Sequence, residues 1–216
     1  MKRIIVPGDL VEDKPLHLMD TFIEENKTYA TVISIYDDEK KSLVPLEGLW
    51  YPQRDEPVIG VIEEAKLNTY TVQLSAPYKG IIISKYTEGK IENGDMVEAY
   101  VKELDKTGTV VLSRPRVLHG GKIVIIRPAK VHRLLGRANT MVKQISDGTG
   151  AMIKVGMNGA VWLKGGNIDI ATDAVLRIQN EAHISGLTER IGNMVKDTAP
   201  KNASEPQAPK KHEESA

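Results

Sequence analysis

Apolar and polar residues alternate in short segments through the first half of the chain, a pattern typical of β-strands with one buried face. In the first fifty residues, segment 28–36 alternates between apolar and polar residues and a charged turn follows at 37–41. Segment 42–46 is then expected to be a strand that runs back from this turn. The pattern breaks at 50–57, where proline, arginine and acidic residues interrupt it. The chain is therefore predicted to begin with a small N-terminal β domain over residues 1–54.

A more regular set of β segments follows this break. Five of them are expected, over residues 58–67, 69–75, 80–84, 96–104 and 109–113. Glycine-containing turns at Gly94 and Gly108 separate the last three. Five short strands within about sixty residues suit a small closed barrel of the OB type, since closure leaves no exposed sheet edge. We assign this barrel to residues 55–117.

The pattern changes again after residue 121. A strand over 122–126 is followed by helices over 129–135 and 140–146, strands over 151–155 and 160–164, and a helical region from 169 to about 196. The order β-α-α-β-β-α is that of a type I KH domain, assigned to 118–196. The predicted fold class is thus multidomain, mainly β plus α/β. Residues 197–216 hold three prolines and little apolar surface, which predicts a disordered tail.

Composition narrows the functional classes. The 216 residues include no cysteine, which excludes disulfides, thiolate zinc sites and a cysteine nucleophile. The apolar run near the N-terminus is too short for a signal peptide, and no stretch approaches the roughly 18 apolar residues of a membrane helix. The expected location is the cytoplasm, with no membrane partner.

The formal net charge is zero, but it is unevenly distributed. Residues 1–54 carry −3, 55–116 carry −2, 117–196 carry +6 and the last twenty carry −1. Such asymmetry indicates one region that faces a polyanion. A solvated basic face is the alternative interpretation.

Two parts of the sequence resemble known RNA-binding domains. The barrel resembles an S1 domain through the segments VIGVIEE, NTYTVQL, GIIIS and NGDMVEAYVKELDKTGTVVLS. The stretch LLGRANTMVKQISDGTGAMIKVG resembles a KH core. The domain order, the turn Gly156-Met157-Asn158-Gly159 and the terminal segment AHISGLTERI resemble the RNA-binding cap subunits of the archaeal exosome.

The KH loop departs from the usual Gly-x-x-Gly, because its fourth residue is Asn139. Asparagine tolerates positive φ better than most residues, so the turn can survive, although a Cβ then stands near the expected phosphate position. Arginine guanidinium groups and the unpaired amides at the start of a helix are suitable donors to phosphate oxygens. The alternative interpretation of these basic residues is a solvated face without a ligand. The predicted RNA contacts of this domain are Lys130, Arg133, Gly136, Arg137, Ala138, Asn139 and Lys143.

On the barrel, two tyrosines bracket the second strand and are candidate stacking platforms for bases. An equally open alternative for each tyrosine is that the ring packs within the protein while the hydroxyl faces water. The expected contacts here are Tyr70 and Tyr78, with Lys79, Lys85, Arg114 and Arg116 steering the RNA backbone. Trp50, Tyr51 and Trp162 are expected to be core or subunit-interface anchors instead.

The residues favour no enzymatic chemistry. The histidines at 17, 119, 132, 183 and 212 form no HExxH motif and no close pair. Asp169 and Asp173 lie near a predicted helix start, where acids complement the helix dipole. Gly148-Thr149-Gly150 lacks the third glycine of a dinucleotide fingerprint and fits a helix C-terminal turn. We predict no catalytic residue, no metal site and no cofactor.

The resemblance implies a non-catalytic subunit that delivers single-stranded RNA to a separate nuclease. Three copies would cap a hexameric ring of RNase PH-like subunits, which would perform 3′-to-5′ phosphorolytic decay. Two alternatives stay open: an S1/KH RNA-binding factor in transcription or translation, and a stand-alone nuclease. Fold resemblance does not by itself decide among them.

Overall fold

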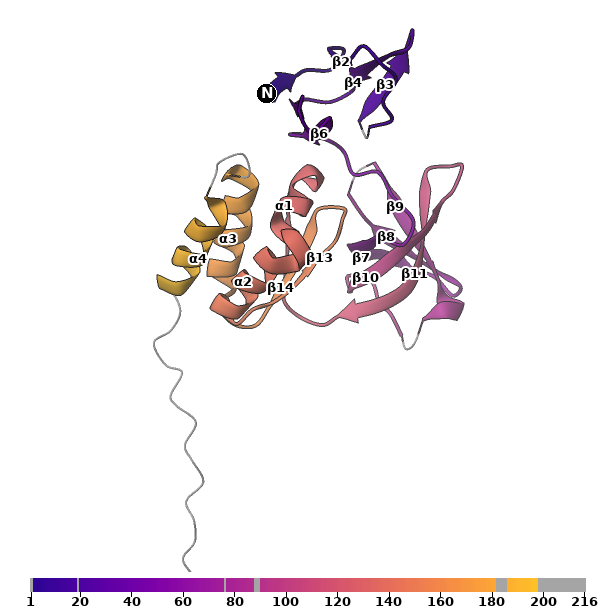
Figure 1. Cartoon of the computed structure of the whole chain (residues 1–216). Coiled ribbons are helices and arrows are strands. Elements are labelled where there is room, and N and C mark those ends of the chain that lie inside the picture. Colours follow the sequence, from indigo (N-terminus) through magenta and orange to yellow (C-terminus); the bar gives the residue numbers. More distant parts are fainter. Residues whose placement is uncertain (1, 19, 76, 88–89, 182–185, 198–216) are drawn as a thin grey trace, which may run out of the picture.

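The computed structural model describes residues 2–18, 20–75, 77–87, 90–181 and 186–197. The chain passes in sequence through a β region, a barrel and a helical region (Figure 1). The predicted multidomain, mainly β plus α/β fold is confirmed.

The N-terminal region is built from two small antiparallel sheets. One has the order β2 (Leu10–Glu12), β4 (Lys27–Ala30), β3 (Thr21–Glu24), and the other has β1 (Lys2–Ile5), β5 (Ser34–Asp37), β6 (Ser42–Pro45). The single strand predicted over 28–36 was wrong, because β4 and β5 belong to different sheets. The chain bends at 31–33 while alternation continues, so apolar periodicity alone gives no sign of the break.

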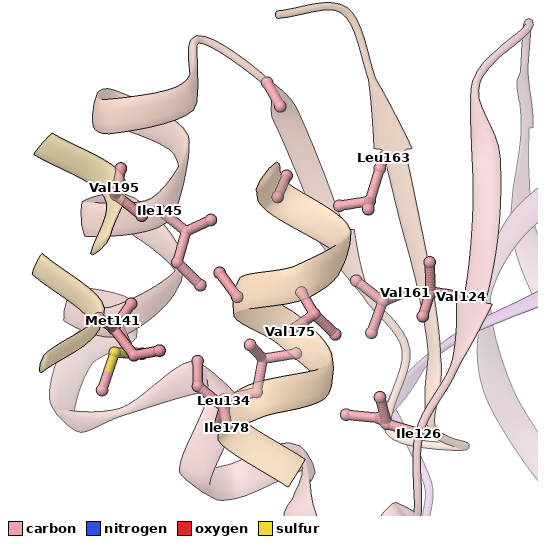
Figure 2. Packing of buried hydrophobic residues seen from close by; sticks show 14 of the residues in the cluster. Val124, Ile126, Leu134, Met141, Ile145, Val161, Leu163, Val175, Ile178 and Val195 are labelled. Atoms are coloured by element: carbon pink, nitrogen blue, oxygen red, sulfur yellow. The ribbon is translucent and has the colours of Figure 1, made fainter. Parts of the chain in front are cut away.

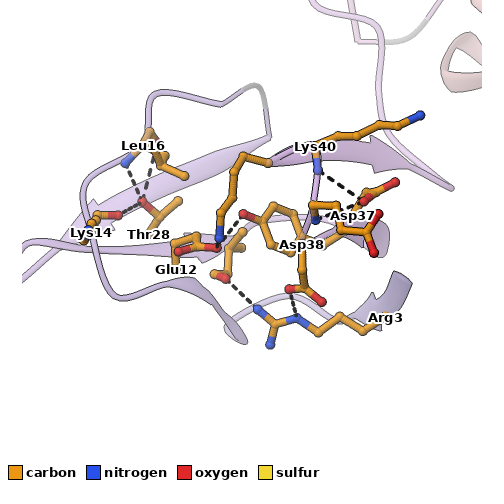
Figure 3. A network of polar contacts seen from close by, with 12 residues as sticks. Arg3, Glu12, Lys14, Leu16, Thr28, Asp37, Asp38 and Lys40 are labelled. Carbon is orange, nitrogen blue, oxygen red and sulfur yellow. Dashed lines mark hydrogen bonds and ion pairs between the residues drawn. The ribbon is translucent and has the colours of Figure 1, made fainter. Parts of the chain in front are cut away.

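Polar contacts join these two sheets (Figure 3). The Glu12 carboxylate accepts a hydrogen bond from the Tyr36 hydroxyl at 2.7 Å and pairs with Lys41. The Lys41 bond, followed by the Tyr36 bond, holds the pKa of Glu12 below its usual value. Burial, and then the bond to Glu12, raises the pKa of Tyr36. The Arg3 guanidinium also bonds the Val11 carbonyl at 2.6 Å, so a small apolar core is reinforced by polar links.

The second unit is the predicted closed barrel, in the order β10 (Met96–Leu104), β11 (Thr109–Leu118), β9 (Lys79–Ile83), β8 (Thr69–Gln73), β7 (Pro57–Ala65). Strand β7 pairs with β10 to close it, and β9 and β11 are the parallel pair. A short 3-10 turn, η1 (Ser84–Tyr86), follows β9. A Cβ at Gly60 would lie 2.5 Å from the Gln73 carbonyl oxygen, so β7 needs glycine there.

The third unit has the predicted KH order. Strands β12 (Lys122–Ile125), β14 (Ala160–Lys164) and β13 (Met152–Val155) form one antiparallel sheet in that order. Its helices are α1 (Val131–Leu135), α2 (Thr140–Thr149), α3 (Ile168–Glu181) and α4 (Leu187–Asp197), with 3-10 turns η2 (Pro128–Lys130) and η3 (Arg137–Asn139). The helical region expected from 169 onward is described as two helices, and residues 182–185 lie outside the described part.

Helix α2 runs further than the sequence suggests. It passes through Gly148 and ends at Thr149, and the following residue, Gly150, caps it with a φ of 68°. A Cβ at Gly148 would lie 1.8 Å from the Val195 side chain, so this glycine lets α4 approach α2 closely. Figure 2 shows Val195 and Ile145 near this crossing, within the core shared by the helices and the sheet. The expected helix C-terminal turn is thus found at Gly150, whereas Gly148 serves the packing of two helices.

The barrel and the KH sheet share a buried junction. All but the last residue of β14 is buried: Val161 and Leu163 belong to the helical core, while Ala160 and Trp162 pack with Ile59. The Trp162 indole N–H donates to the carbonyl of Gly120 at 2.8 Å. Trp162 is therefore a core anchor, as expected.

The turn Gly156-Met157-Asn158-Gly159 forms the other half of this junction. The Asn158 side chain is 1% exposed, and its Nδ2 donates to the Ile59 carbonyl at 2.8 Å while its Oδ1 accepts from the Ile59 N–H at 3.2 Å. The N–H of Met157 donates to the carbonyl of Pro57 at 2.8 Å. The turn belongs to the sequence resemblance, but its role, which is to fasten the KH domain to β7, has no local sign in the sequence.

The apolar clusters provide a basis for dividing the chain. The N-terminal cluster lies within 1–54, the barrel cluster takes Trp50 and Met157 from outside 55–117, and the helical cluster lies within 118–196. We propose these as the domain boundaries.

The tail predicted over 197–216 lies outside the described residues, apart from Asp197. No helix among the described residues is long and apolar enough to span a membrane.

Candidate nucleic-acid interface

The loop between α1 and α2 has an unusual backbone. Gly136 (φ 69°, ψ −176°) ends α1, and a Cβ there would lie 3.1 Å from Met141. Ala138 (φ 49°, ψ 38°) and Asn139 (φ 61°, ψ 22°) both occupy the left-handed region. The turn therefore survives with asparagine in fourth place, as expected. The left-handed Ala138 was not expected, since alanine is disfavoured there by roughly 1–2 kcal/mol.

Asn139 directly precedes α2. Within the described residues, its side chain forms no capping hydrogen bond with the helix. The first N–H groups of a helix lack intrahelical partners, so the start of α2 offers amide donors together with the positive end of the helix dipole. Residues 137–140 are all exposed. This loop can therefore present free backbone donors to an anion.

Three cations surround the loop. Arg133 on α1, Arg137 in the loop and Lys143 on α2 are all exposed. In the part of the chain that the structure describes, none of the three forms an ion pair or a side-chain hydrogen bond. Their charges are consequently available to a ligand, and the exposed basic surface predicted here is retained.

Lys130 does not join this group. Its side chain is only 9% exposed, and it lines a cleft with Arg127 and Glu47 on the side facing the N-terminal sheet. Burial, and then the nearby Arg127 charge, lowers the pKa of the Lys130 ammonium, while Glu47 opposes this. A phosphate contact beside Arg137 is at odds with this position, because the Lys130 side chain lies in the cleft beside Arg127 and Glu47.

The barrel tyrosines are mostly engaged in packing. Tyr70 is 9% exposed and belongs to the barrel core, because alternation along β8 points it inward and leaves Thr69 and Thr71 toward the outside. This contradicts its predicted use as a surface platform. Tyr78 is half-buried, with its ring edge-on to Trp50 at 5.6 Å and to Tyr51 at 6.2 Å.

The tryptophan and tyrosine expected to act as anchors differ in exposure. Trp50 is 5% exposed and belongs to the barrel core, and its indole N–H donates to Glu56 at 3.2 Å. Tyr51 is 63% exposed, and its ring lies edge-on to that of Tyr78 on the barrel. The linker between the first two domains is thus fixed to the barrel through Trp50.

Two of the four barrel cations are held by acids. Lys79 pairs with Glu63 at 3.1 Å. Arg114 pairs with Asp55 at 3.1 Å and lies over the Tyr100 ring at 4.2 Å, in a bulge where its φ is 50°. Lys85 and Arg116 are exposed, and Arg116 lies opposite Glu98 on β10.

The residues weighed for enzymatic chemistry have ordinary structural positions. Asp169 lies in the first turn of α3, and the N–H of Gly150 closes α2 by donating to Ser146 at 2.8 Å. Among the described residues, no three His, Cys, Asp or Glu side chains gather as metal ligands would. His183 and His212 lie outside the described part of the chain.

An OB-type barrel fastened to a type I KH domain, behind a small β domain, defines the class of multidomain protein to which this chain belongs. No protein-family model matches the chain. The chain is 32% identical to "Exosome complex component Rrp4" of Pyrococcus furiosus over 90% of its length and 83% of that protein. The corresponding protein of Methanothermus fervidus is 32% identical, with 90% and 95% covered.

A solved structure agrees with this relationship. A crystal structure described as that of a candidate exosome complex RNA-binding protein is 30% identical, with a TM-score of 0.63. The match covers 69% of this chain and 97% of the other. The chain belongs to the Rrp4 family of exosome complex components.

Proposed function

We propose that this chain is a non-catalytic RNA-binding subunit of an exosome-type complex that degrades RNA from the 3′ end. It would cap a ring of RNase PH-like subunits and guide single-stranded RNA toward their active sites. Family membership supports this proposal, since the relatives are named as exosome components.

The observation that carries RNA binding is the exposed, unpaired basic surface around the KH loop. Arg133, Arg137 and Lys143 surround backbone amides at the start of α2, in a domain of net charge +6. Guanidinium groups and free amides are suitable donors to phosphate oxygens. Because binding would release counterions from the RNA, its affinity should fall steeply with salt.

The barrel is assigned a secondary role in RNA binding. Lys85 and Arg116 are exposed and can steer the RNA backbone electrostatically, without the base stacking that a surface aromatic would add. Three copies around the ring would surround its entry with these barrels. The N-terminal domain and one KH face would then supply much of the contact with the ring.

The assembly is tested by affinity purification of the tagged, full-length chain with mass spectrometry of its partners. We expect RNase PH-like subunits, and phosphate-dependent RNA decay that needs them and accelerates when this chain is present. Recovery of ribosomal or polymerase subunits instead would favour the alternative of a factor in transcription or translation.

The non-catalytic assignment has a separate test. Purified chain incubated with 3′-end-protected and unprotected labelled RNA, with magnesium or phosphate, should leave both RNAs intact. Shortening by the chain alone, which co-elutes with the protein through successive columns, would make it a nuclease and overturn this part of the proposal.

A further inference from the structure

The end of the barrel away from the N-terminal domain carries the most exposed large apolar side chain among the described residues. Leu67 is 92% exposed, at the tip of the hairpin that joins β7 to β8. Strand β7 starts next to the linker from the N-terminal domain, and its nine residues span roughly 30 Å before the tip (Figure 1). Under the proposed function the N-terminal domain contacts the ring, so this end would face incoming RNA.

Leucine is an unusual residue for the tip of a hairpin. Such positions favour Gly, Asn, Asp, Pro and Ser, because these residues fit turn conformations or hydrogen-bond the local backbone. An exposed leucine adds no burial energy to the fold, since its side chain stays in water. A residue that departs from the local turn chemistry without a gain in packing is a sign of functional use.

The rest of the barrel holds this tip in place. The N–H of Lys66 donates to the carbonyl of Thr69 at 2.9 Å and closes the turn. The Ser84 hydroxyl donates to the Leu67 carbonyl at 3.1 Å, and the Ser84 N–H donates to the Asn68 carbonyl at 2.9 Å. A side chain on a fixed turn has less freedom to lose on binding, so it is suited to insertion into a ligand.

Ser84 also links the tip to a free cation. It is the first residue of η1, and the next residue, Lys85, is exposed and forms no ion pair or side-chain hydrogen bond within the described part of the chain. The lysine of the tip itself, Lys66, pairs with Glu64 at 2.9 Å. One apolar side chain therefore lies beside one unpaired positive charge, and single-stranded RNA offers the matching sequence of apolar base faces and phosphates.

We propose that Leu67 inserts between neighbouring bases of incoming single-stranded RNA while Lys85 pairs with the phosphate that joins them. Apolar side chains, leucine among them, separate stacked bases in this way in other nucleic-acid complexes. The insertion supplies the base contact that Tyr70, buried in the barrel core, does not. The inference rests on the proposed function in one respect, since it takes RNA to be the ligand.

The test is Leu67→Ser in the full-length chain, titrated with single-stranded RNA that contains 2-aminopurine. This base fluoresces weakly when it is stacked, so insertion should raise its fluorescence on binding wild type, and the variant should lose that rise. RNA affinity should fall roughly three- to fivefold with an unchanged salt slope, because an apolar contact is lost and no charge is removed. Lys85→Ala should instead reduce the salt slope by about one and keep the rise in fluorescence.

Leu49→Ser is the matched control, because Leu49 is 78% exposed in the linker at the other end of the barrel. It should bind RNA with the affinity and fluorescence of wild type. Wild-type behaviour of Leu67→Ser, or an equal loss in Leu49→Ser, would overturn the insertion. A loss of affinity for the reconstituted ring, with RNA binding unchanged, would show that the tip contacts protein, which also overturns it. If wild type fails to bind RNA, the proposed function itself fails, and the insertion with it.

Discussion

The KH loop and the barrel surface both carry residues that the sequence marks as RNA contacts, but the structure treats them differently. Around the loop, Arg133, Arg137 and Lys143 are exposed and have no side-chain partner among the described residues. On the barrel, Tyr70 is buried, Tyr78 packs against two aromatic rings, and Lys79 and Arg114 are paired with acids.

We therefore rank the two surfaces by the freedom of their side chains from internal partners, and not by residue type alone. A cation that is already paired must give up that partner before it neutralises a phosphate, whereas an unpaired cation gains the full contact. By this criterion we expect the KH loop to contribute more RNA affinity than the barrel.

The largest expected effect separates packing from binding on the barrel. Tyr70→Ala should destabilise the chain by about 3 kcal/mol, because it empties part of the barrel core. Chemical denaturation measures this, and the RNA affinity of the folded fraction should stay within about twofold of wild type. Tyr70→Phe is the conservative control. If it weakens RNA binding without changing stability, Tyr70 contacts RNA and the comparison fails.

Charge reversal in the loop should have the next largest effect. Arg137→Glu is expected to weaken single-stranded RNA binding about tenfold at low salt and to flatten its salt dependence, since a phosphate contact is replaced by repulsion. Fluorescence anisotropy over a salt series measures both quantities. Lys40→Glu in the N-terminal domain makes the same change in net charge at another exposed position and should have little effect. Equal losses in the two variants would point to net charge rather than the loop.

Restoring the second loop glycine should act in the opposite direction. Asn139→Gly removes a Cβ at a residue whose φ is already 61°, so the backbone conformation is kept while phosphates can approach more closely. We expect RNA affinity to rise roughly two- to fivefold by titration. Ala138→Gly, one residue earlier, is the comparison and should change affinity less. Unchanged binding for Asn139→Gly would mean that phosphates do not approach this position.

The smallest expected effect concerns the paired arginine of the barrel. Arg114→Ala removes the Asp55 pair and the contact with the Tyr100 ring, which should cost about 0.5–1 kcal/mol of stability at this exposed site. RNA affinity should change less than twofold, because the guanidinium is already engaged. A loss of RNA affinity as large as that of Arg137→Glu would mean that the barrel contributes as much RNA affinity as the loop.

Much of the fold could be predicted from local patterns. Alternation gave the five barrel strands because each has one face in the barrel core, and glycines placed their turns. The KH order followed from the change to helical spacing after residue 126. The bend between β4 and β5, and the use of Gly148 as a helix contact, depend on distant segments and have no local sign in the sequence.

The candidate site was less predictable, because burial and pairing are decided by tertiary structure. Lys130 and Arg133 are three residues apart in a basic stretch, yet one is interior and the other exposed. Tyr70 lies in a strand whose alternation could have placed either face inward, and the barrel placed its ring inside. Asn158 looked like an ordinary turn residue, although the turn fastens two domains.

Photo-crosslinking of full-length chain to single-stranded RNA, with mass spectrometry of the crosslinked peptides, tests the ranking of the two surfaces most directly. We predict that the strongest crosslinks fall in the loop and the start of α2, between Arg133 and Lys143, with weaker ones near Lys85 and Arg116 on the barrel. Crosslinks confined to the barrel, with none in the loop, would contradict the account.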